Sequence, residues 1–166
     1  MIQLIYRILN RLRLSYFNLR YYNFRQKYSI HESFVFNGVD IEMYGDGNII
    51  IGENSYIGNR STIASVKGQK VHIGKNCSIS HNVRFYTINR NPIDIINNKS
   101  VIGKIQGDII VGNNVWIGAN VFINQNVTIG DNVVIGANSV VTKNLDSNCI
   151  YAGTPAKLIK SSVDSQ

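Results

Sequence analysis

Histidine is the side chain best suited to proton transfer near neutral pH, and this chain contains three, at positions 31, 72 and 81. His81 stands in Ile79-Ser80-His81-Asn82-Val83, at a position where the chain is expected to turn a corner. An outward-pointing imidazole there could take a proton from a hydroxyl or an amine as that group attacks a carbonyl. The alternative is a polar residue on a surface turn, where asparagine or aspartate would serve equally well. His81 is therefore the first candidate for a catalytic base.

Composition excludes several classes of protein. With 166 residues, 44% of them hydrophobic and 16% charged, the chain has the length of one folded domain and is not charge-rich disorder. Six of its seven excess positive charges belong to residues 1–30, which carry no acidic side chain, so the remaining body is nearly neutral. That distribution argues against a nucleic-acid partner. Cys77 and Cys149 have no metal-ligand spacing, so neither a disulfide framework nor a structural zinc site is expected.

Residues 1–32 are expected to form a basic amphipathic helical segment. Apolar side chains recur at helical spacing, whereas most of the arginines fall off that stripe; the apolar residues are Ile5, Ile8, Leu9, Leu12 and Tyr16. Two roles are open: residues 1–28 touch an anionic membrane surface, or the helix packs on the protein and caps it. No apolar run is long enough to span a membrane and no signal peptide is legible, so we expect a cytoplasmic protein, at the inner face of the membrane if the first role holds.

A six-residue repeat organises most of the chain. From Val111 it reads VGNNVW, IGANVF, INQNVT, IGDNVV, IGANSV and VTKNLD, and earlier hexads begin at Ile51, Ile57, Ile73 and Ile79. The aliphatic residue at position one suits extended backbone, while glycine at position two and asparagine at position four tolerate positive φ at turns. Short strands joined by repeated corners wind into a solenoid with the first position facing inward. Cys77, at position five of its hexad, is expected to be a small core residue.

The hexads between about Ile49 and Lys160 resemble those of the hexapeptide-repeat acyltransferases, as does the late segment Ala152-Gly153-Thr154-Pro155-Ala156-Lys157. The resemblance implies an all-β fold: a left-handed parallel β-helix with three hexads per coil, an N-terminal helical segment, an inserted loop and a short C-terminal helix. The expected divisions are 1–32 for the helical segment, 33–154 for the β-helix with its loop at about 86–108, and 155–166 for a C-terminal cap and tail. The family usually forms homotrimers with active sites between neighbours.

The repeat breaks twice. Ile73 follows Ile63 at a spacing of ten positions instead of six, which indicates a small bulge around 66–70, and a longer stretch without legible hexads separates Phe85 from Val111. If one coil takes three hexads, stacking Ile79 under Ile117 requires an excursion of about twenty residues and puts His81 under Ala119. An excursion shorter or longer by one hexad would instead place Asn113 or Gln125 above His81. We favour the first register, because Gly118-Ala119 matches the corner that faces the thioester in the family.

The resemblance also implies a site. His81 matches the catalytic histidine of the family's sugar acyltransferases, and the Ala119 backbone N–H matches its oxyanion donor. In maltose-type O-acetyltransferases, however, the histidine lies in the loop, in a Tyr-Thr-x-x-His-Pro-like segment. Here the corresponding segment, 85–92, reads FYTINRNP and has no histidine. Either His81 is the base, or the chain has lost its base.

The remaining candidates fall into two groups. Acetyl-CoA, the implied co-substrate, would meet Gly118, Ala119, Ala137, Thr142, Lys143, Lys157 and Lys160. The acceptor would meet Arg84, Tyr86, Asn89, Arg90 and Trp116, although Trp116 could equally pack at a subunit interface. A metal site, as in the γ-class carbonic anhydrases of the same fold, is not expected, because the three histidines do not have that family's ligand spacing.

Together these features predict an acetyl-CoA-dependent O-acetyltransferase that modifies a sugar of a bacterial surface polysaccharide or its precursor. The alternatives are an N-acetyltransferase of a nucleotide-linked amino sugar, and a non-catalytic β-helix scaffold that has lost the loop histidine.

Overall fold

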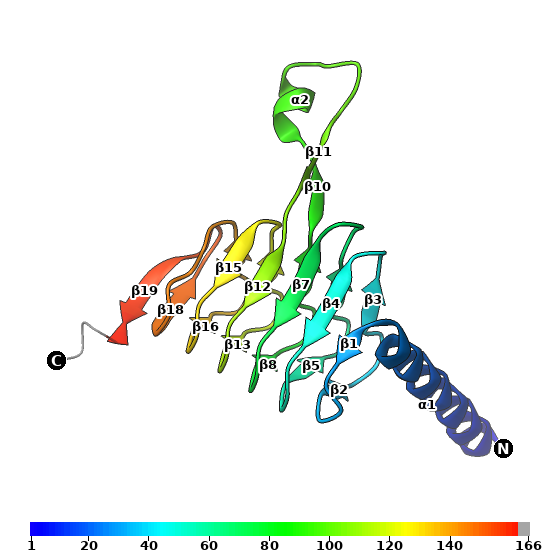
Figure 1. The fold of residues 1–166 in the computed structure, drawn as a ribbon. Helices are drawn as coiled ribbons and strands as arrows, with labels where there is room; N and C mark the ends of the chain where they lie inside the picture. Colours follow the sequence, from blue (N-terminus) through cyan, green and yellow to red (C-terminus); the bar gives the residue numbers. More distant parts are fainter. Residues whose placement is uncertain (163–166) are drawn as a thin grey trace.

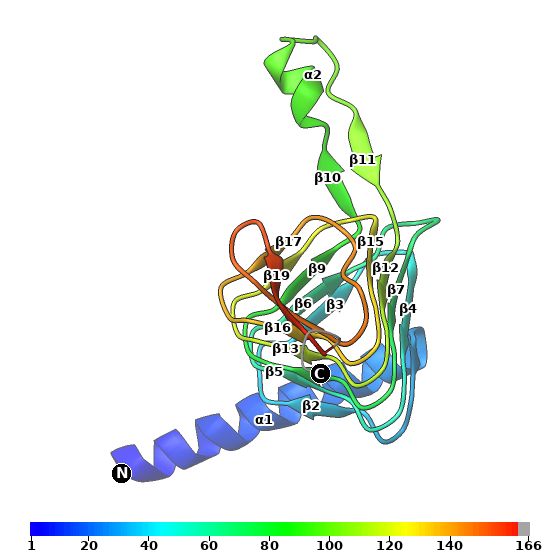
Figure 2. The same ribbon diagram turned by 90° about the vertical axis from the view of Figure 1, so that its left-hand side faces the viewer.

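The structure, a computed structural model, describes residues 1–162 and has the form of a three-sided solenoid (Figures 1 and 2). Three parallel sheets, A, B and C, form its sides, and the chain visits them in that order in each coil. Sheet A contains β1 (Ser29–Ile30), β4 (Asn48–Ile51), β7 (Lys70–Ile73), β12 (Ile109–Val111) and β15 (Val127–Ile129). Sheet B contains β2 (Val35–Asn37), β5 (Tyr56–Gly58), β8 (Ser78–Ile79), β13 (Trp116–Ile117), β16 (Val134–Ile135) and β18 (Cys149–Ala152), followed by an antiparallel strand, β19 (Lys157–Ser161). Sheet C contains β3 (Glu42–Tyr44), β6 (Thr62–Ala64), β9 (Arg84–Tyr86), β14 (Phe122–Ile123) and β17 (Val140–Val141).

The predicted register is confirmed. Ile117 pairs with Ile79 and Trp116 pairs with Ser78, so the excursion between these two coils has the length that the sequence predicted. The next coil has the regular length of three hexads, since Ile117 pairs with Ile135. Position-one aliphatics stack inside each sheet, and Cys77 is fully buried with them, as expected for a core residue. Burial also raises the pKa of the Cys77 thiol, which makes it a poor nucleophile.

Position four of the hexads behaves as predicted, and position two does not. Asparagines at position four take the left-handed conformation, with φ of 56° at Asn114 and 60° at Asn120. Their side chains also form ladders from coil to coil. The hexad glycines such as Gly118 are absent from the residues with positive φ. Glycine is required there for space, because a Cβ at Gly118 would lie 2.6 Å from the Ala137 nitrogen of the next coil.

The insertion is a structured arm. It rises as an antiparallel pair, β10 (Ile88–Arg90) and β11 (Lys104–Gln106), and carries a short helix, α2 (Pro92–Ile96), near its tip (Figure 1). It leaves the solenoid at the corner between sheets C and A, directly after β9. Asn89 fixes its base by donating to the Asn124 Oδ1 at 3.0 Å and to the Gln125 Oε1 at 2.6 Å.

The two ends of the chain depart from the expected boundaries. Where a short C-terminal helix was expected, the described residues form a strand. β19 pairs antiparallel with β18 and is the edge strand of sheet B. Extended backbone there satisfies the exposed hydrogen-bonding groups of the last coil. Residues 163–166 of the expected tail lie outside the described part. At the other end, the solenoid already begins with β1 at Ser29, so it includes residues assigned to the helical segment.

Helix α1 (Ile2–Lys27) packs on the first coil through its C-terminal half. Its buried side chains are Phe17, Tyr21 and Phe24, and the Tyr21 ring stacks on Phe36 with centroids 4.4 Å apart. Ion pairs join Arg13 to Asp40 at 3.1 Å and Arg20 to Glu42. The helix therefore covers the open first coil, as one of the two expected roles requires, but not with the expected apolar stripe. In the described part of the chain, no helix combines the length and hydrophobicity needed to cross a bilayer.

The arm is held together by interactions of the ionised Asp94 carboxylate, which acid would remove. Asp94, buried at the start of α2, pairs with the Lys99 Nζ at 2.6 Å and accepts a hydrogen bond from the Gly103 N–H at 2.9 Å. Both interactions favour the ionised form, the ion pair with Lys99 most strongly, and they lower the pKa of Asp94.

We therefore expect the arm to loosen selectively in acid. A lowered folded-state pKa stabilises the arm above the ordinary carboxyl pKa of about 4, and this stabilisation is lost as pH falls through the lower folded value. Hydrogen exchange of residues 91–103, corrected for intrinsic rates, should accelerate over that range while sheet A stays protected. Asp94→Asn should exchange faster at neutral pH and show little further change in acid. An arm whose protection is independent of pH in the wild type would contradict this role.

Candidate functional site

The predicted residues around His81 form a column on the corner between sheets B and C, which we call the BC corner. The Asn82 N–H donates to the Asn59 carbonyl at 2.8 Å, and the Asn120 N–H donates to the His81 carbonyl at 3.0 Å. One coil further, the Asn138 N–H donates to the Ala119 carbonyl at 2.8 Å. The order along the corner is thus residue 59, His81, Ala119 and Ala137, as the register predicted for His81 and Ala119.

Backbone N–H groups on the BC corner have side-chain acceptors before His81 and none from His81 onward, within the described residues. The Val39 N–H is capped by the Asn59 Oδ1 at 2.7 Å, and the Asn59 N–H is capped by the His81 Nδ1 at 3.1 Å. The next three, those of His81, Ala119 and Ala137, have no hydrogen-bond partner within residues 1–162, because the side chain one coil ahead of each has no acceptor. The corner therefore presents three stacked donors from residues that are exposed or half-buried.

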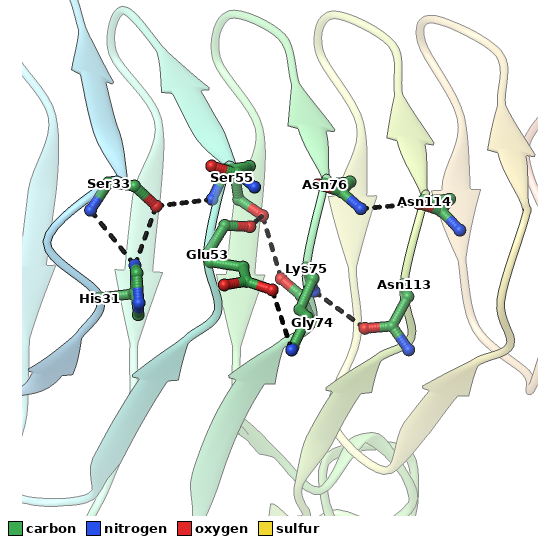
Figure 3. A network of polar contacts seen from close by, with 10 residues as sticks. His31, Ser33, Glu53, Ser55, Gly74, Lys75, Asn76, Asn113 and Asn114 are labelled. Atoms are coloured by element: carbon green, nitrogen blue, oxygen red, sulfur yellow. Dashed lines mark hydrogen bonds and ion pairs between the residues drawn. The ribbon is translucent and has the colours of Figure 1, made fainter.

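The corner between sheets A and B shows the opposite arrangement (Figure 3). There the Lys75 N–H is capped by the Asn113 Oδ1 at 2.9 Å, and the Asn113 N–H by the Asp131 Oδ1 at 2.6 Å. Lys75 also pairs with Glu53 at 2.9 Å, which lowers the pKa of that carboxyl. Since side chains cap successive N–H groups on this corner, the run of free donors on the BC corner results from Ala119, Ala137 and Gly153, the residues one coil ahead, which have no side-chain acceptor.

The His81 ring is exposed and held in one orientation. Because a backbone N–H can only donate, the bond from Asn59 requires an unprotonated Nδ1, and the neutral ring carries its proton on Nε2. The ring lies against Gly58, where a Cβ would come within 2.6 Å of Nδ1. In this orientation His81 offers a donor to solvent, and its lone pair is occupied by Asn59.

Trp116 and the C-terminal lysines lie on sheet B, where Trp116 is in register with Ile150 and Lys160. Trp116 is 57% exposed. Lys160 and Lys157 pair with Ile150 and Ala152 of β18, which are two residues apart and so face the same side of the strand. Lys160 lines a hollow with Asn132 and Asn148, at the end of sheet B that adjoins the corner between sheets A and B. Of the two lysines, Lys157 is thus the one nearer the BC corner, where it pairs with Ala152.

The other predicted residues lie on sheet C or beyond it. Arg84 and Tyr86 belong to β9 on sheet C, where Arg84 donates to the Asn82 Oδ1 at 2.9 Å and the Tyr86 ring lies 5.5 Å from that of Phe122. A hydrogen bond to Tyr86, together with burial as the larger cause, raises the pKa of Tyr44. The last four predicted residues lie past sheet C. Thr142 and Lys143 follow β17, at the corner between sheets C and A, and Asn89 and Arg90 belong to the arm above that corner. One protomer thus does not bring Thr142 and Lys143 together with Ala137.

Asn59 and Gly58 are the site residues that sequence reasoning missed. The signal was the ten-residue step from Ile63 to Ile73, which makes one coil longer than three hexads and puts position 59 one coil before His81. His31 and His72 lie elsewhere: His31 is on the corner between sheets A and B and His72 is on sheet A. Within residues 1–162 no three side chains of the His, Cys, Asp and Glu types gather as metal ligands do.

Known families match this chain over its repeats. Residues 108–143 match the model of the bacterial transferase hexapeptide with six repeats, and residues 48–83 match that of the hexapeptide repeat of succinyl-transferase. The polysialic acid O-acetyltransferase of Escherichia coli O1:K1 / APEC is 39% identical over 134 residues, which are 81% of this chain and 43% of the relative. The chain spans about half the length of the curated relatives it matches.

Solved structures agree on the fold. A maltose O-acetyltransferase from Clostridium difficile 630 is 34% identical, with a TM-score of 0.59 over 78% of this chain and 71% of that one. A hexapeptide-repeat acetyltransferase from Vibrio cholerae, solved with acetyl-CoA, is 26% identical, with a TM-score of 0.70 over 92% of this chain and 84% of that one. The solenoid is a left-handed β-helix, and the chain belongs to the hexapeptide-repeat acetyltransferase family.

Proposed function

We propose that this protein is an acetyl-CoA-dependent acetyltransferase whose acceptor is a sugar hydroxyl of a bacterial surface polysaccharide or its precursor. The observation that carries the proposal is the run of three free backbone N–H groups at His81, Ala119 and Ala137, next to an exposed imidazole. Fixed donors of this kind stabilise the negative charge that develops on a carbonyl oxygen during acyl transfer. The acetyltransferase relatives support the same chemistry.

The BC corner and the face of sheet B fit acetyl-CoA in three respects. The free N–H groups suit the amide carbonyls of the pantetheine arm, Lys157 and Lys160 suit its phosphates, and the small, half-buried Ala119 leaves room beside the backbone. Bound acetyl-CoA supplies an activated acetyl carbonyl, which an acceptor hydroxyl attacks with release of the coenzyme A thiol. The Ala119 N–H donates to the oxygen of that carbonyl.

In this proposal His81 accepts the proton of the acceptor hydroxyl. Its lone pair becomes available once the ring turns about the Cβ–Cγ bond and releases the Asn59 N–H, since Nδ1 is occupied in the resting orientation. Because the ring is exposed and makes no other hydrogen bond within residues 1–162, this turn costs one neutral hydrogen bond, on the order of 1 kcal/mol.

The acceptor lies against Trp116 on one side of His81 and against Arg84 and Tyr86 on the other. The arm residues Asn89 and Arg90, and the coenzyme candidates Thr142 and Lys143, would join from a neighbouring protomer of a homotrimer. Their position one side of the coil away from Ala137 supports this division between subunits.

Transfer to a panel of sugars tests the function directly, with free coenzyme A as the readout. The panel contains oligosaccharides with free hydroxyls, sialic acid polymers and nucleotide-linked amino sugars. Acceptor-dependent release with O-acetylated product supports the proposal, and an N-acetylated product would replace it with the amino-sugar alternative.

A second candidate function, a non-catalytic scaffold, is favoured by the occupied Nδ1 of His81 and by an arm without histidine. The wild-type protein separates the two: no acceptor-dependent turnover and no binding of coenzyme A by calorimetry would favour the scaffold.

Charge removal on β19 gives a further prediction. The double variant Lys157→Ala, Lys160→Ala should raise the KM for acetyl-CoA about tenfold with a smaller change in kcat, because each lysine is expected to contact phosphate and not the reacting carbon. Lys104→Ala on the arm, which also removes an exposed lysine, is the matched control. Unchanged KM in the double variant would exclude β19 from the coenzyme site.

A further inference from the structure

The apolar stripe of α1 is left uncovered by the packing of the helix on the solenoid. At 100° per residue, the stripe occupies about 100° of the helix circumference, whereas the side chains that pack on the first coil lie on the far side. Its six residues are half or more exposed: Ile5, Ile8, Leu9, Leu12, Tyr16 and Leu19. Figure 2 shows the N-terminal half of α1 extending beyond the outline of the solenoid. The stripe thus faces solvent along the whole free part of the helix.

Charge decides which partner suits this stripe. The helix carries six cations and no acidic side chain. Arg11 lies about 110° from the middle of the stripe on one flank, whereas Arg13, on the other flank, pairs with Asp40 of the first coil. Arg7 and Arg11 have no ion pair within residues 1–162, so their charge is uncompensated. A second copy of this helix would be repelled, and the nearly neutral solenoid of another copy offers no matching charge.

We propose that α1 docks in the plane of a bilayer surface rich in anionic lipid. The stripe enters the boundary between headgroups and acyl chains, while the unpaired Arg11 remains at the level of the lipid phosphates. The contact of Phe17, Tyr21 and Phe24 with the first coil then holds the solenoid beside the membrane. This proposal is independent of acetyl transfer, because neither the stripe nor Arg11 lines the hollow around His81.

Vesicle co-sedimentation of the full-length protein tests the docking. Wild type should bind vesicles of phosphatidylcholine mixed two to one with phosphatidylglycerol far better than pure phosphatidylcholine vesicles, and added salt should weaken the binding. Leu12→Asp, in the middle of the stripe, should partition at least about tenfold more weakly than Leu14→Asp. Leu14 is also exposed, lies about 160° away around the helix and receives the same charge, so the ratio reports the face alone.

Circular dichroism and sedimentation velocity of each variant without vesicles complete the experiment. Equal helicity and equal mass in both variants, with the binding difference above, support docking on lipid. The proposal is overturned if wild type ignores anionic vesicles, or if both variants bind equally. A smaller mass for Leu12→Asp, together with no vesicle binding by wild type, would assign the stripe to a contact between copies of the chain.

Discussion

Replacing His81 by alanine is expected to lower kcat for acetyl transfer by about 10²–10⁴-fold, the usual contribution of a positioned acid–base group. The KM for acetyl-CoA should change little, because the free N–H groups at Ala119 and Ala137 remain. Initial rates of coenzyme A release, measured with the acceptor found in the panel, give both constants. The variant should fold normally, since the His81 side chain is exposed and is not part of the hydrophobic core.

Two further variants separate a base from a hydrogen-bond donor at this position. His81→Gln keeps an N–H donor but cannot take the proton, so a base predicts that it is as inactive as the alanine variant. A donor acting through Nε2–H, the resting orientation, predicts that glutamine retains part of the rate. Gly58→Ala should also reduce kcat, because its Cβ would displace the ring. Alanine at position 81 with wild-type turnover would remove His81 from the mechanism.

Ile123→Ala is expected to destabilise the solenoid by about 2–5 kcal/mol, the largest stability effect we predict for a single core substitution. Ile123 is fully buried and pairs with Phe85 below and Val141 above, so the lost methylenes leave a cavity between three coils. The cavity lies next to β9, the strand after which the chain leaves the solenoid for the arm. Denaturant unfolding followed by circular dichroism measures the change.

Ile96→Ala is the matched control for this substitution. Ile96 is 76% exposed on the arm, so the same chemical change should alter stability by less than about 0.5 kcal/mol. Equal effects of the two substitutions would show that the column of position-one residues is not the stabilising core. Unfolding at several protein concentrations separates any contribution of subunit association.

The register could be predicted from the sequence because the hexad determines it. An aliphatic residue at every sixth position must face inward, and asparagine four positions into the repeat takes the left-handed turn, so Ile79 and Ile117 can stack with few alternatives. The inserted arm interrupts the hexads but keeps the register of the strands, because Ile109 and Ile117 must again face the core when the chain returns to the solenoid.

Features that depend on single contacts could not be predicted in the same way. The orientation of the His81 ring follows from one hydrogen bond to the preceding coil, and no periodicity encodes that contact. At the C-terminus, Lys157-Leu158-Ile159-Lys160 reads equally well as a helix or a strand; pairing with β18 decides for the strand. Apolar spacing in α1 correctly indicates a helix, but the aromatic side chains Phe17, Tyr21 and Phe24 select the face that packs.

The central claim is that acetyl-CoA lies along the BC corner, and methyl NMR of the five alanines tests it most directly. In protein labelled at the alanine methyls, the signals of Ala119 and Ala137 should shift saturably as acetyl-CoA is added. Ala64, buried on sheet C, should not move. Saturable shifts at Ala119 and Ala137 alone, or with the neighbouring Ala152 and Ala156, are the predicted result. Saturation without any change at Ala119 and Ala137 would contradict the account.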